Sequence, residues 1–306
     1  MPQIRFLVIS DTHNDHFPPT SSLPPADVVL HCGDLTQVGG LFNYRRALES
    51  LASCPAELKL VIPGNHDLSL DANWWAANLD PEEDGPDEAE EPQRARAIFH
   101  EDKYVNRGVR LLDEGRHTIT LRDGRSFTLY ASPFTPGFNN HAFAYARNGA
   151  GTRFDDGADG PGSSRIPDDV DVIMTHGPPR PPKTSRMAYG NYALDCDIND
   201  KPIRHLGCEK LWTAMERVRP KMHCFGHIHE GHGAQRATFR SGEDEEITTV
   251  ENALVTETDD VCCYTATVND DDDGNRTTLL VNAAIQKMHG ETGQNKAWVV
   301  DMALLK

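Results

Sequence analysis

Residues 221–233 read KMHCFGHIHEGHG, a short apolar run followed by a cluster of histidines. Four imidazole side chains, His223, His227, His229 and His232, fall within these thirteen positions. A histidine-rich stretch is compatible with a metal site, a pH-responsive surface or chance, and the segment alone does not distinguish them. The remainder of the chain therefore decides what these side chains do.

Short apolar runs like the one at 222–225 recur along the whole chain. They are rich in Val, Ile and Leu, and Gly, Pro, Asp or Asn residues bound them, so they predict buried strands. The predicted strands are 6–9, 28–30, 58–62, 127–131, 170–174, 222–225, 279–281 and 298–300. Helical spacing predicts helices over 41–52, 93–105 and 208–218, the last of which stops before Pro220. Alternating strands and helices predict an α/β core with helices over the sheet faces.

The length of 306 residues and mass of 33.9 kDa suit one large core or at most two smaller ones. The sequence has no internal repeat and no break in composition, so we predict a single domain over 1–306 with acidic insertions at about 80–92 and 234–276. Gly and Asp turns near 124 and 274 predict that the later strands pair as hairpins, which makes a mixed sheet.

Polar groups follow five of the predicted strands directly. The five segments are Ser10-Asp11-Thr12-His13, His31-Cys32-Gly33-Asp34, Pro63-Gly64-Asn65-His66-Asp67, Thr175-His176-Gly177 and Gly226-His227-Ile228-His229. A single Asp or His after a strand is usually a turn, capping or structural residue. Five such strand ends in one chain indicate a common site, because groups that follow the strands of an α/β sheet collect along one edge.

The residue types at these ends are those of a metal site. The seven groups are Asp11, His13, Asp34, Asn65, His176, His227 and His229. They are too many for one tetrahedral ion but suit two ions that share a carboxylate, for which Asp34 is the natural candidate. Imidazoles with oxygen donors and no thiolate favour Mn, Fe, Zn or Co over Ca or Mg. Two such ions activate a shared water and clamp a phosphate, so the set predicts phosphoester hydrolysis by a bridging hydroxide attacking in line.

These motifs resemble those of the calcineurin-like metallophosphoesterase superfamily. The resemblance covers residues of about 4–68, 170–180 and 221–233 and, more loosely, Val281-Asn282-Ala283. Within the superfamily, THGPP at 175–179 and FGHIHEGHG at 225–233 are most similar to the MPPED-type predicted phosphodiesterases, which are related to class III cyclic nucleotide phosphodiesterases. The resemblance implies a four-layer αββα sandwich of two mixed sheets flanked by helices.

The resemblance also implies a role for each residue of the site. One metal would be bound by Asp11, His13, Asp34 and His229, and the other by Asp34, Asn65, His176 and His227. His66 would face the phosphate and stabilise the transition state or protonate the leaving oxygen, and Asp67 would orient the His66 ring. Asn65, His66 and His232 are therefore the candidate substrate-binding residues, and His66 and Asp67 the catalytic ones.

The sequence differs from the family pattern in two places. Two of its histidines, His223 and His31, are expected not to bind metal. The segment after Asp34 lacks the Arg that follows in the protein Ser/Thr phosphatase branch, and the acidic segment 234–276 is long, as a lid or an extra hairpin would be. His223 falls inside a strand pattern and is expected to be packed, and His31 is expected to support the site without binding metal.

The formal net charge of −17 is unevenly distributed. Residues 80–91 contain eight acids and no base, and residues 243–276 contain twelve acids and one base, which leaves 27 acids against 29 Lys and Arg in the rest. The acidity is therefore expected to belong to solvated surface insertions, with an electrostatic screen against polyanions as the alternative. Nucleic acid is an unfavoured partner, because binding to phosphate backbones needs clustered Lys and Arg.

The cysteine pattern and the N-terminus predict a cytoplasmic protein. The seven cysteines contain no CxxC pair, which fits reduced, buried thiols and neither a disulfide framework nor a thiolate zinc site. The opening MPQIRFLVIS predicts a strand and not a signal peptide, and no segment has the roughly 18 apolar residues of a membrane span.

The leading functional hypothesis is a dinuclear metal phosphodiesterase for small phosphoesters, with cyclic nucleotides as candidate substrates. The alternatives are a phosphomonoesterase, acting on nucleotides or proteins, and a weakly active nucleotide-binding scaffold. The complete set of candidate ligands argues against the scaffold, and the missing basic groove argues against a nuclease.

Overall fold

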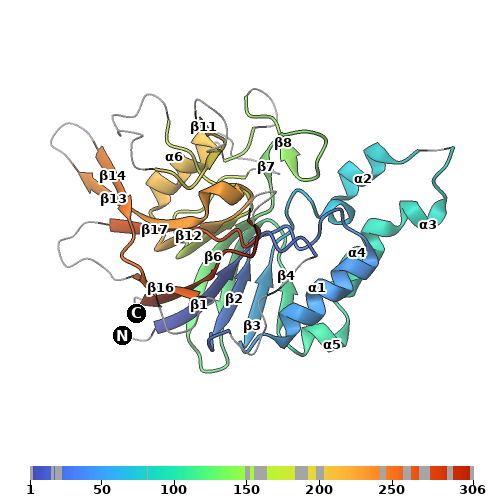
Figure 1. Cartoon of the computed structure of the whole chain (residues 1–306), viewed down its shortest axis with the longest axis horizontal. Helices are drawn as coiled ribbons and strands as arrows, with labels where there is room; N and C mark the ends of the chain where they lie inside the picture. Colours follow the sequence, from blue (N-terminus) through green and yellow to red (C-terminus); the bar gives the residue numbers. More distant parts are fainter. Residues whose placement is uncertain are drawn as a thin grey trace.

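The structure is a computed structural model of the chain (Figure 1). It describes residues 3–14, 17, 23–80, 82–148, 152–154, 164–182, 192–197, 203–241, 246–257, 263–268, 276–287 and 292–303. It confirms the predicted fold class, two mixed β-sheets flanked by helices. Among the described residues, no helix is both long and apolar enough to cross a bilayer.

The first sheet contains, within the described residues, seven strands in the order β15-β16-β18-β1-β2-β3-β4. The strands are β1 (Gln3–Ile9), β2 (Val28–His31), β3 (Leu58–Val61), β4 (Val109–Leu111), β15 (Thr256–Glu257), β16 (Cys263–Val268) and β18 (Ala297–Ala303). The strands from β1 to β4 run parallel, whereas β18 is antiparallel to β1. The sheet is therefore mixed.

The second sheet also has seven strands in the part of the chain that is described, in the order β14-β13-β17-β12-β9-β6-β5. The strands are β5 (Gly115–Thr120), β6 (Ser126–Ser132), β9 (Val172–Thr175), β12 (Met222–Phe225), β13 (Gly233–Ser241), β14 (Glu246–Asn252) and β17 (Arg276–Asn282). Its central strands β6, β9, β12 and β17 are parallel, and its edges are antiparallel.

Alternate side chains of each central strand face different cores. Phe6 and Val8 of β1 pack between the two sheets with residues such as Met222 of β12, while Leu7 and Ile9 face the helices on the outer side. Both faces of the strand are thus buried, which explains why the strands read as continuous apolar runs and do not alternate with polar residues.

The helices cover the outer faces of the sandwich and complete four layers (Figure 1). The helical segments are α1 (Leu41–Ser53), η1 (Leu68–Leu70), α2 (Ala72–Asn78), α3 (Pro86–Ala89), α4 (Glu91–Phe99), α5 (Asp102–Val105), α6 (Glu209–Val218) and η3 (His229–Gly231). Helices α1, α4 and α5 contribute to the core outside the first sheet, and α6 packs outside the second. Short strand pairs β7 (Thr135–Pro136) with β8 (Ala144–Tyr145) and β10 (Cys196–Asp197) with β11 (Arg204–His205) lie in the connecting segments.

Two predictions about local structure are wrong. The single helix expected over 93–105 is two helices, because the extended backbone at Glu101 turns the chain so that Phe99 and Tyr104 are both buried. The turn near 124 does join the hairpin of β5 and β6, with Gly124 at φ 87°. The turn expected near 274 lies outside the described residues, but the strands on either side of it do not pair as a hairpin, because β16 belongs to the first sheet and β17 to the second.

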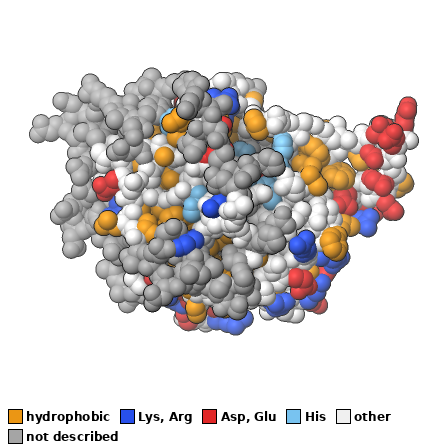
Figure 2. Space-filling model, in the orientation of Figure 1, with side chains coloured by type: hydrophobic (Ala, Val, Ile, Leu, Met, Phe, Trp, Pro, Cys, Tyr) orange, Lys and Arg blue, Asp and Glu red, His pale blue; other side chains and the backbone are white. Residues whose placement is uncertain are grey.

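The two acidic segments differ in structure. In 80–92 the described residues form α3 and the start of α4, and Figure 2 shows Asp and Glu side chains gathered at that end of the molecule. The described parts of 234–276 are mostly strand. β13 and β14 form an antiparallel hairpin at the edge of the second sheet, as in the extra-hairpin option, and β15 and β16 extend the first.

Candidate metal centre

The candidate site lies where the carboxyl ends of β1, β2 and β3 meet those of β9 and β12. Backbone hydrogen bonds connect the segments within each sheet: Asp11 N donates to Gly33 O (2.9 Å), and Gly226 N donates to His176 O (3.0 Å). The two sheets are joined across the sandwich by His227 N, which donates to both oxygens of Asp11 at 3.0 and 3.1 Å. The site thus contains residues that are far apart in the sequence, such as Asp11 and His227, which are 216 positions apart.

Four residues of the site have an unusual backbone conformation. Asp11, His13, Asp34 and His227 have φ values of 56°, 42°, 55° and 70°, in the left-handed region that residues other than glycine seldom occupy. Such conformations cost of the order of 1–3 kcal/mol each and persist where the surrounding structure imposes them, often at functional sites. Here they turn the side chains from several strand ends toward one point.

Glycines leave room for the side chains to approach one another. A Cβ atom on Gly64 would lie 2.2 Å from Asp34 Oδ1 and 2.7 Å from His176 Cε1. A Cβ atom on Gly226 would lie 2.0 Å from Asp11 Oδ2. Only glycine fits at these two positions, since any side chain would displace a carboxylate of the site.

The donor atoms have spacings that suit metal ions. Asp34 Oδ2 lies 3.6 Å from His13 Nε2 and 3.3 Å from His176 Nε2, and His13 Nε2 lies 3.4 Å from His229 Nε2. Ligand atoms that share an ion at 2.0–2.2 Å lie about 3–3.5 Å apart. Two candidate groups of mutually close donors result: one is Asp11, His13 and His229, and the other is Asp11, Asp34 and His176.

The remaining predicted ligands lie beside these groups. Asn65 Oδ1 is 2.9 Å from His176 Nε2, and the ring of His227 is centred 5.1 Å from that of His176. The other nitrogen of His176, Nδ1, donates to the carbonyl oxygen of Cys32 (2.8 Å). This contact directs Nε2 into the site, as an outer-shell partner does for a metal-binding histidine. The predicted seven residues are thus gathered in one place, and their assignment to individual ions stays a prediction.

The carboxylates of the site are held in their ionised form. Burial alone would raise the pKa values of Asp11 and Asp34, but His229 and His176 respectively, with His13, lower both well below the usual range. Burial lowers the pKa of His13 and lowers that of His227 to about 3, so these rings are neutral. Burial also opposes the charged form of His176, yet Asp34 raises its pKa to about 9. Ionised carboxylates and neutral imidazoles are the forms that bind metal, and the field that favours an imidazolium at His176 also favours a metal cation.

Asp67 has a different partner from the one expected. Its carboxylate accepts hydrogen bonds from the backbone amides of Gly64, Leu35 and Thr36 and from the Thr36 hydroxyl, and so ties two ligand-bearing segments together. The expectation that Asp67 orients the His66 ring is therefore corrected. His66 Nδ1 instead donates to the carbonyl oxygen of Gln37 (2.8 Å), which turns its Nε2 edge away from that segment.

His232 is held in place by two neighbours. Its ring packs against Trp298, with centres 5.4 Å apart, and its Nε2 lies 3.0 Å from the carbonyl oxygen of Lys296. His232 is not among the residues that line the cavity described below, and its contact with substrate stays a prediction. His223 and His31 are buried, as expected, and bond the hydroxyls of Thr175 and Thr12.

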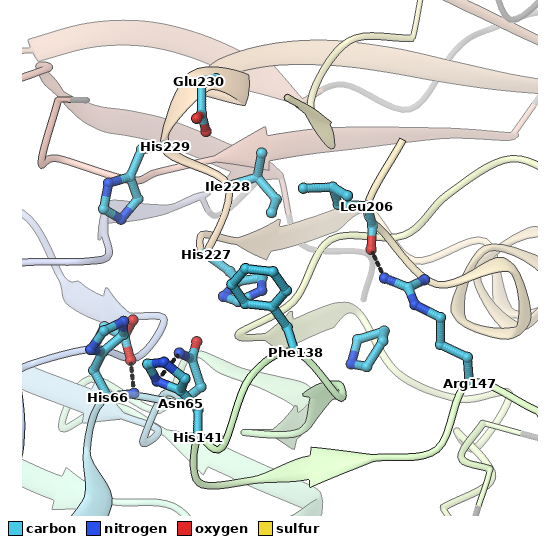
Figure 3. Close-up of a pocket in the computed structure, with 12 residues that line it drawn as sticks. Asn65, His66, Phe138, His141, Arg147, Leu206, His227, Ile228, His229 and Glu230 are labelled. Atoms are coloured by element: carbon cyan, nitrogen blue, oxygen red, sulfur yellow. Dashed lines mark hydrogen bonds between the residues drawn. The ribbon is translucent and has the colours of Figure 1, made fainter. Parts of the chain in front are cut away.

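A cavity of about 450 Å³ opens onto the candidate metal centre (Figure 3). Asn65, His66 and His141 lie at one end, and Arg147 lies at the other. Four apolar side chains also line the cavity. They are Pro136, Phe138, Leu206 and Ile228.

Sequence reasoning missed the cavity residues that come from connecting segments. His141 lies between the short strands β7 and β8, nine positions after the end of β6, and Leu206 lies in a segment with no apolar run. The rule that site residues directly follow strand ends does not predict a residue this far from the end of a strand. The one available signal was the set of polar and aromatic residues in 132–147 after a predicted strand, which has no fixed spacing to identify a member.

A family model described as calcineurin-like phosphoesterase matches residues 4–231. The chain belongs to the calcineurin-like phosphoesterase family. The match contains all seven candidate ligands of this calcineurin-like phosphoesterase. Human metallophosphoesterase domain-containing protein 1 is 30% identical over 243 residues, which cover 75% of this chain and 61% of that protein.

Two further relatives have comparable similarity to this calcineurin-like phosphoesterase. UPF0046 protein T07D4.2 of Caenorhabditis elegans is 33% identical over 238 residues, covering 75% of this chain and 52% of that protein. Probable rhamnogalacturonate lyase C of Emericella nidulans is 30% identical over 234 residues, 76% of this chain but 18% of that protein. The chain thus spans between 18% and 61% of the length of these three relatives. The predicted resemblance to MPPED-type proteins is confirmed.

Proposed function

We propose that the protein is a dinuclear metal-dependent phosphodiesterase that hydrolyses small phosphoesters, with cyclic nucleotides as candidate substrates. The observation that carries this proposal is the position of Asp34 Oδ2, within 3.6 Å of His13 Nε2 from one donor group and 3.3 Å of His176 Nε2 from the other. An oxygen between two donor groups is what a bridging carboxylate requires. Two divalent transition-metal ions, Mn, Fe, Zn or Co, would supply an activated water and neutralise phosphate charge.

The chain's own residues would then bind and orient the substrate. His66 N donates to Asp34 Oδ1 (2.8 Å), which holds the His66 segment against the ligand carboxylate. The Gln37 carbonyl holds the His66 ring by Nδ1, so Nε2 is the atom available to a phosphoester in the cavity. His66 would therefore stabilise charge on the phosphate or supply a proton to the leaving oxygen.

The composition of the cavity wall favours a diester over a monoester. A phosphodiester has one negative charge and two organic groups, whereas a monoester is mostly a dianion at neutral pH. Arg147 is the cation among the lining residues, and it already donates to the carbonyl oxygens of Gly207 and Leu206. Four apolar side chains are available to organic groups. A small phosphoester is the proposed partner, and nucleic acid is not.

We also propose a cytoplasmic location. Five cysteines, Cys32, Cys54, Cys196, Cys208 and Cys224, are buried free thiols, which supports a reducing compartment.

The test compares mono- and diesters with each metal. Protein loaded with Mn²⁺, Fe²⁺, Zn²⁺ or Co²⁺ is expected to hydrolyse bis-p-nitrophenyl phosphate faster than p-nitrophenyl phosphate, and cyclic nucleotides are tested alongside. Asp34→Asn should lower kcat by at least about 100-fold, because a neutral amide bridges two cations poorly. Faster monoester hydrolysis would favour the phosphomonoesterase, and a low rate that Asp34→Asn leaves unchanged would favour the scaffold.

A further inference from the structure

His141 lies against the proposed catalytic segment but comes from a different part of the chain. It precedes β8, and its ring centre is 4.5 Å from that of His66, at an interplanar angle of 65°. Its neighbours fix its position: Ala142 N donates to Asn65 O (3.2 Å), and Phe143 N donates to Asp71 Oδ2 (2.7 Å). The ring is partly exposed and lines the cavity (Figure 3).

The hydrogen bonds of Asn65 determine which nitrogen of His141 carries a proton. Asn65 Oδ1 faces His176 Nε2 at 2.9 Å, so the amide nitrogen Nδ2 faces His141 Nδ1 at 3.2 Å. An amide nitrogen only donates, and so His141 Nδ1 accepts. The proton of the neutral ring is therefore on Nε2, the edge away from Asn65. In the part of the chain that the structure describes, no residue accepts a hydrogen bond from this Nε2.

His66 and His141 consequently offer opposite functions to a ligand. The Gln37 carbonyl only accepts, so His66 Nδ1 carries a proton and its Nε2 donates only when the ring is an imidazolium. His141 offers a donor at Nε2 while it is neutral. Phosphoester oxygens are acceptors, and a donor fixed in place before the substrate binds is the arrangement that stabilises charge on them.

We propose that His141 is a substrate-contacting residue with a second, positioning role. Through Nε2–H it donates to a phosphoester oxygen, and through Nδ1 it holds the Asn65 amide with its oxygen toward His176. This inference deepens the proposed function and depends on it. It adds a residue from the β7–β8 segment to a site otherwise built at strand ends.

The experiment compares three variants with the wild type. His141→Ala removes both contacts, while His141→Gln retains an acceptor for Asn65 and a donor for the cavity. His117→Ala is the matched control, because His117 is a partly exposed histidine on β5, away from the cavity, whose ring bonds the carbonyl oxygen of Asp113. Each protein is loaded with Mn²⁺, and circular dichroism checks that it is folded.

Three quantities are measured: metal content, the Kd for inorganic phosphate by calorimetry, and kcat and KM for bis-p-nitrophenyl phosphate. His141→Ala should weaken phosphate binding and lower kcat/KM by about tenfold or more, and the second metal should bind about tenfold more weakly. His141→Gln should recover most of each loss, and His117→Ala should match the wild type.

Two results would overturn the proposal. One is a His141→Ala protein whose phosphate affinity and metal content equal those of the wild type. The other is a His141→Gln protein as impaired as His141→Ala, which would show a purely structural role. Because phosphate and metal binding are measured directly, a wild-type protein that binds both but hydrolyses no diester would contradict the proposed function and leave this test intact.

Discussion

Replacement of Gly64 by alanine should displace the candidate metal centre while leaving the fold in place. A Cβ atom at this position would lie 2.2 Å from Asp34 Oδ1, 2.4 Å from Asp34 N and 2.7 Å from His176 Cε1. Ordinary contacts between such atoms are about 3.5 Å, so the Asp34 carboxylate has to retreat by about 1 Å or more. Displacement of catalytic groups by about 1 Å costs about 100-fold in rate. We therefore expect Gly64→Ala to lower kcat/KM for bis-p-nitrophenyl phosphate by at least about 100-fold.

The assay combines kinetics with elemental analysis of the purified protein. Gly64→Ala should also bind less metal than the wild type, since both donor groups contact Asp34. Gly124→Ala is the control, because Gly124 has a φ of 87° and no atom within 4 Å of an added Cβ. It should lose about 1 kcal/mol of stability through backbone strain alone and keep its metals and rate. A Gly64→Ala protein with full metal content and wild-type activity would refute the reasoning.

Two further predictions concern stability. His205 is hydrogen-bonded to Asp195, and this bond, followed by the contact with Cys196, raises the pKa of His205 to about 10. The His205–Asp195 pair therefore stabilises the protein fully below about pH 6.5, and its contribution falls as the pH rises toward 10. The Tm of the wild type should fall over that range and that of Asp195→Asn should fall less; parallel profiles would contradict the assignment. Arg125 donates to both oxygens of Asp27, and Arg125→Ala should lower the free energy of unfolding in urea by about 1–3 kcal/mol. Arg116→Ala breaks the more exposed ion pair with Asp169 and should lower the free energy of unfolding by less than about 1 kcal/mol. Equal losses in the two variants would show that the Arg125–Asp27 pair is no more stabilising than an exposed ion pair.

The strands and the gathering of the ligands were predictable for the same reason. Strands buried on both faces read as continuous apolar runs, as in Leu7 and Val8 of β1, and the polar residue after such a run is conspicuous. The parallel direction of β1, β2 and β3 then places Asp11, Asp34 and Asn65 at one edge. Sequence alone could not show that the second sheet faces the first, because that pairing depends on contacts between distant segments.

The orientation of individual rings was not predictable. The family resemblance implies that Asp67 orients the ring of His66, its neighbour in the sequence. In the structure the Asp67 carboxylate accepts from Leu35 and Thr36, which are more than thirty positions away. The His66 ring donates a hydrogen bond to the backbone carbonyl oxygen of Gln37. Every residue has a backbone carbonyl, so the sequence does not indicate which one accepts. The same holds for His141, whose partner Asn65 is 76 residues away.

Two pairs of strands lie at the outer margins of the sheets, β13 with β14 and β15 with β16. Both pairs are added at the outer margin of a sheet, and the ligand-bearing turns follow interior strands. A strand at the edge of a sheet forms backbone hydrogen bonds with the strand beside it, and it does not contribute a predicted metal ligand. A change in the length of these edge strands would therefore alter the surface of the protein without moving the turns that bear the ligands.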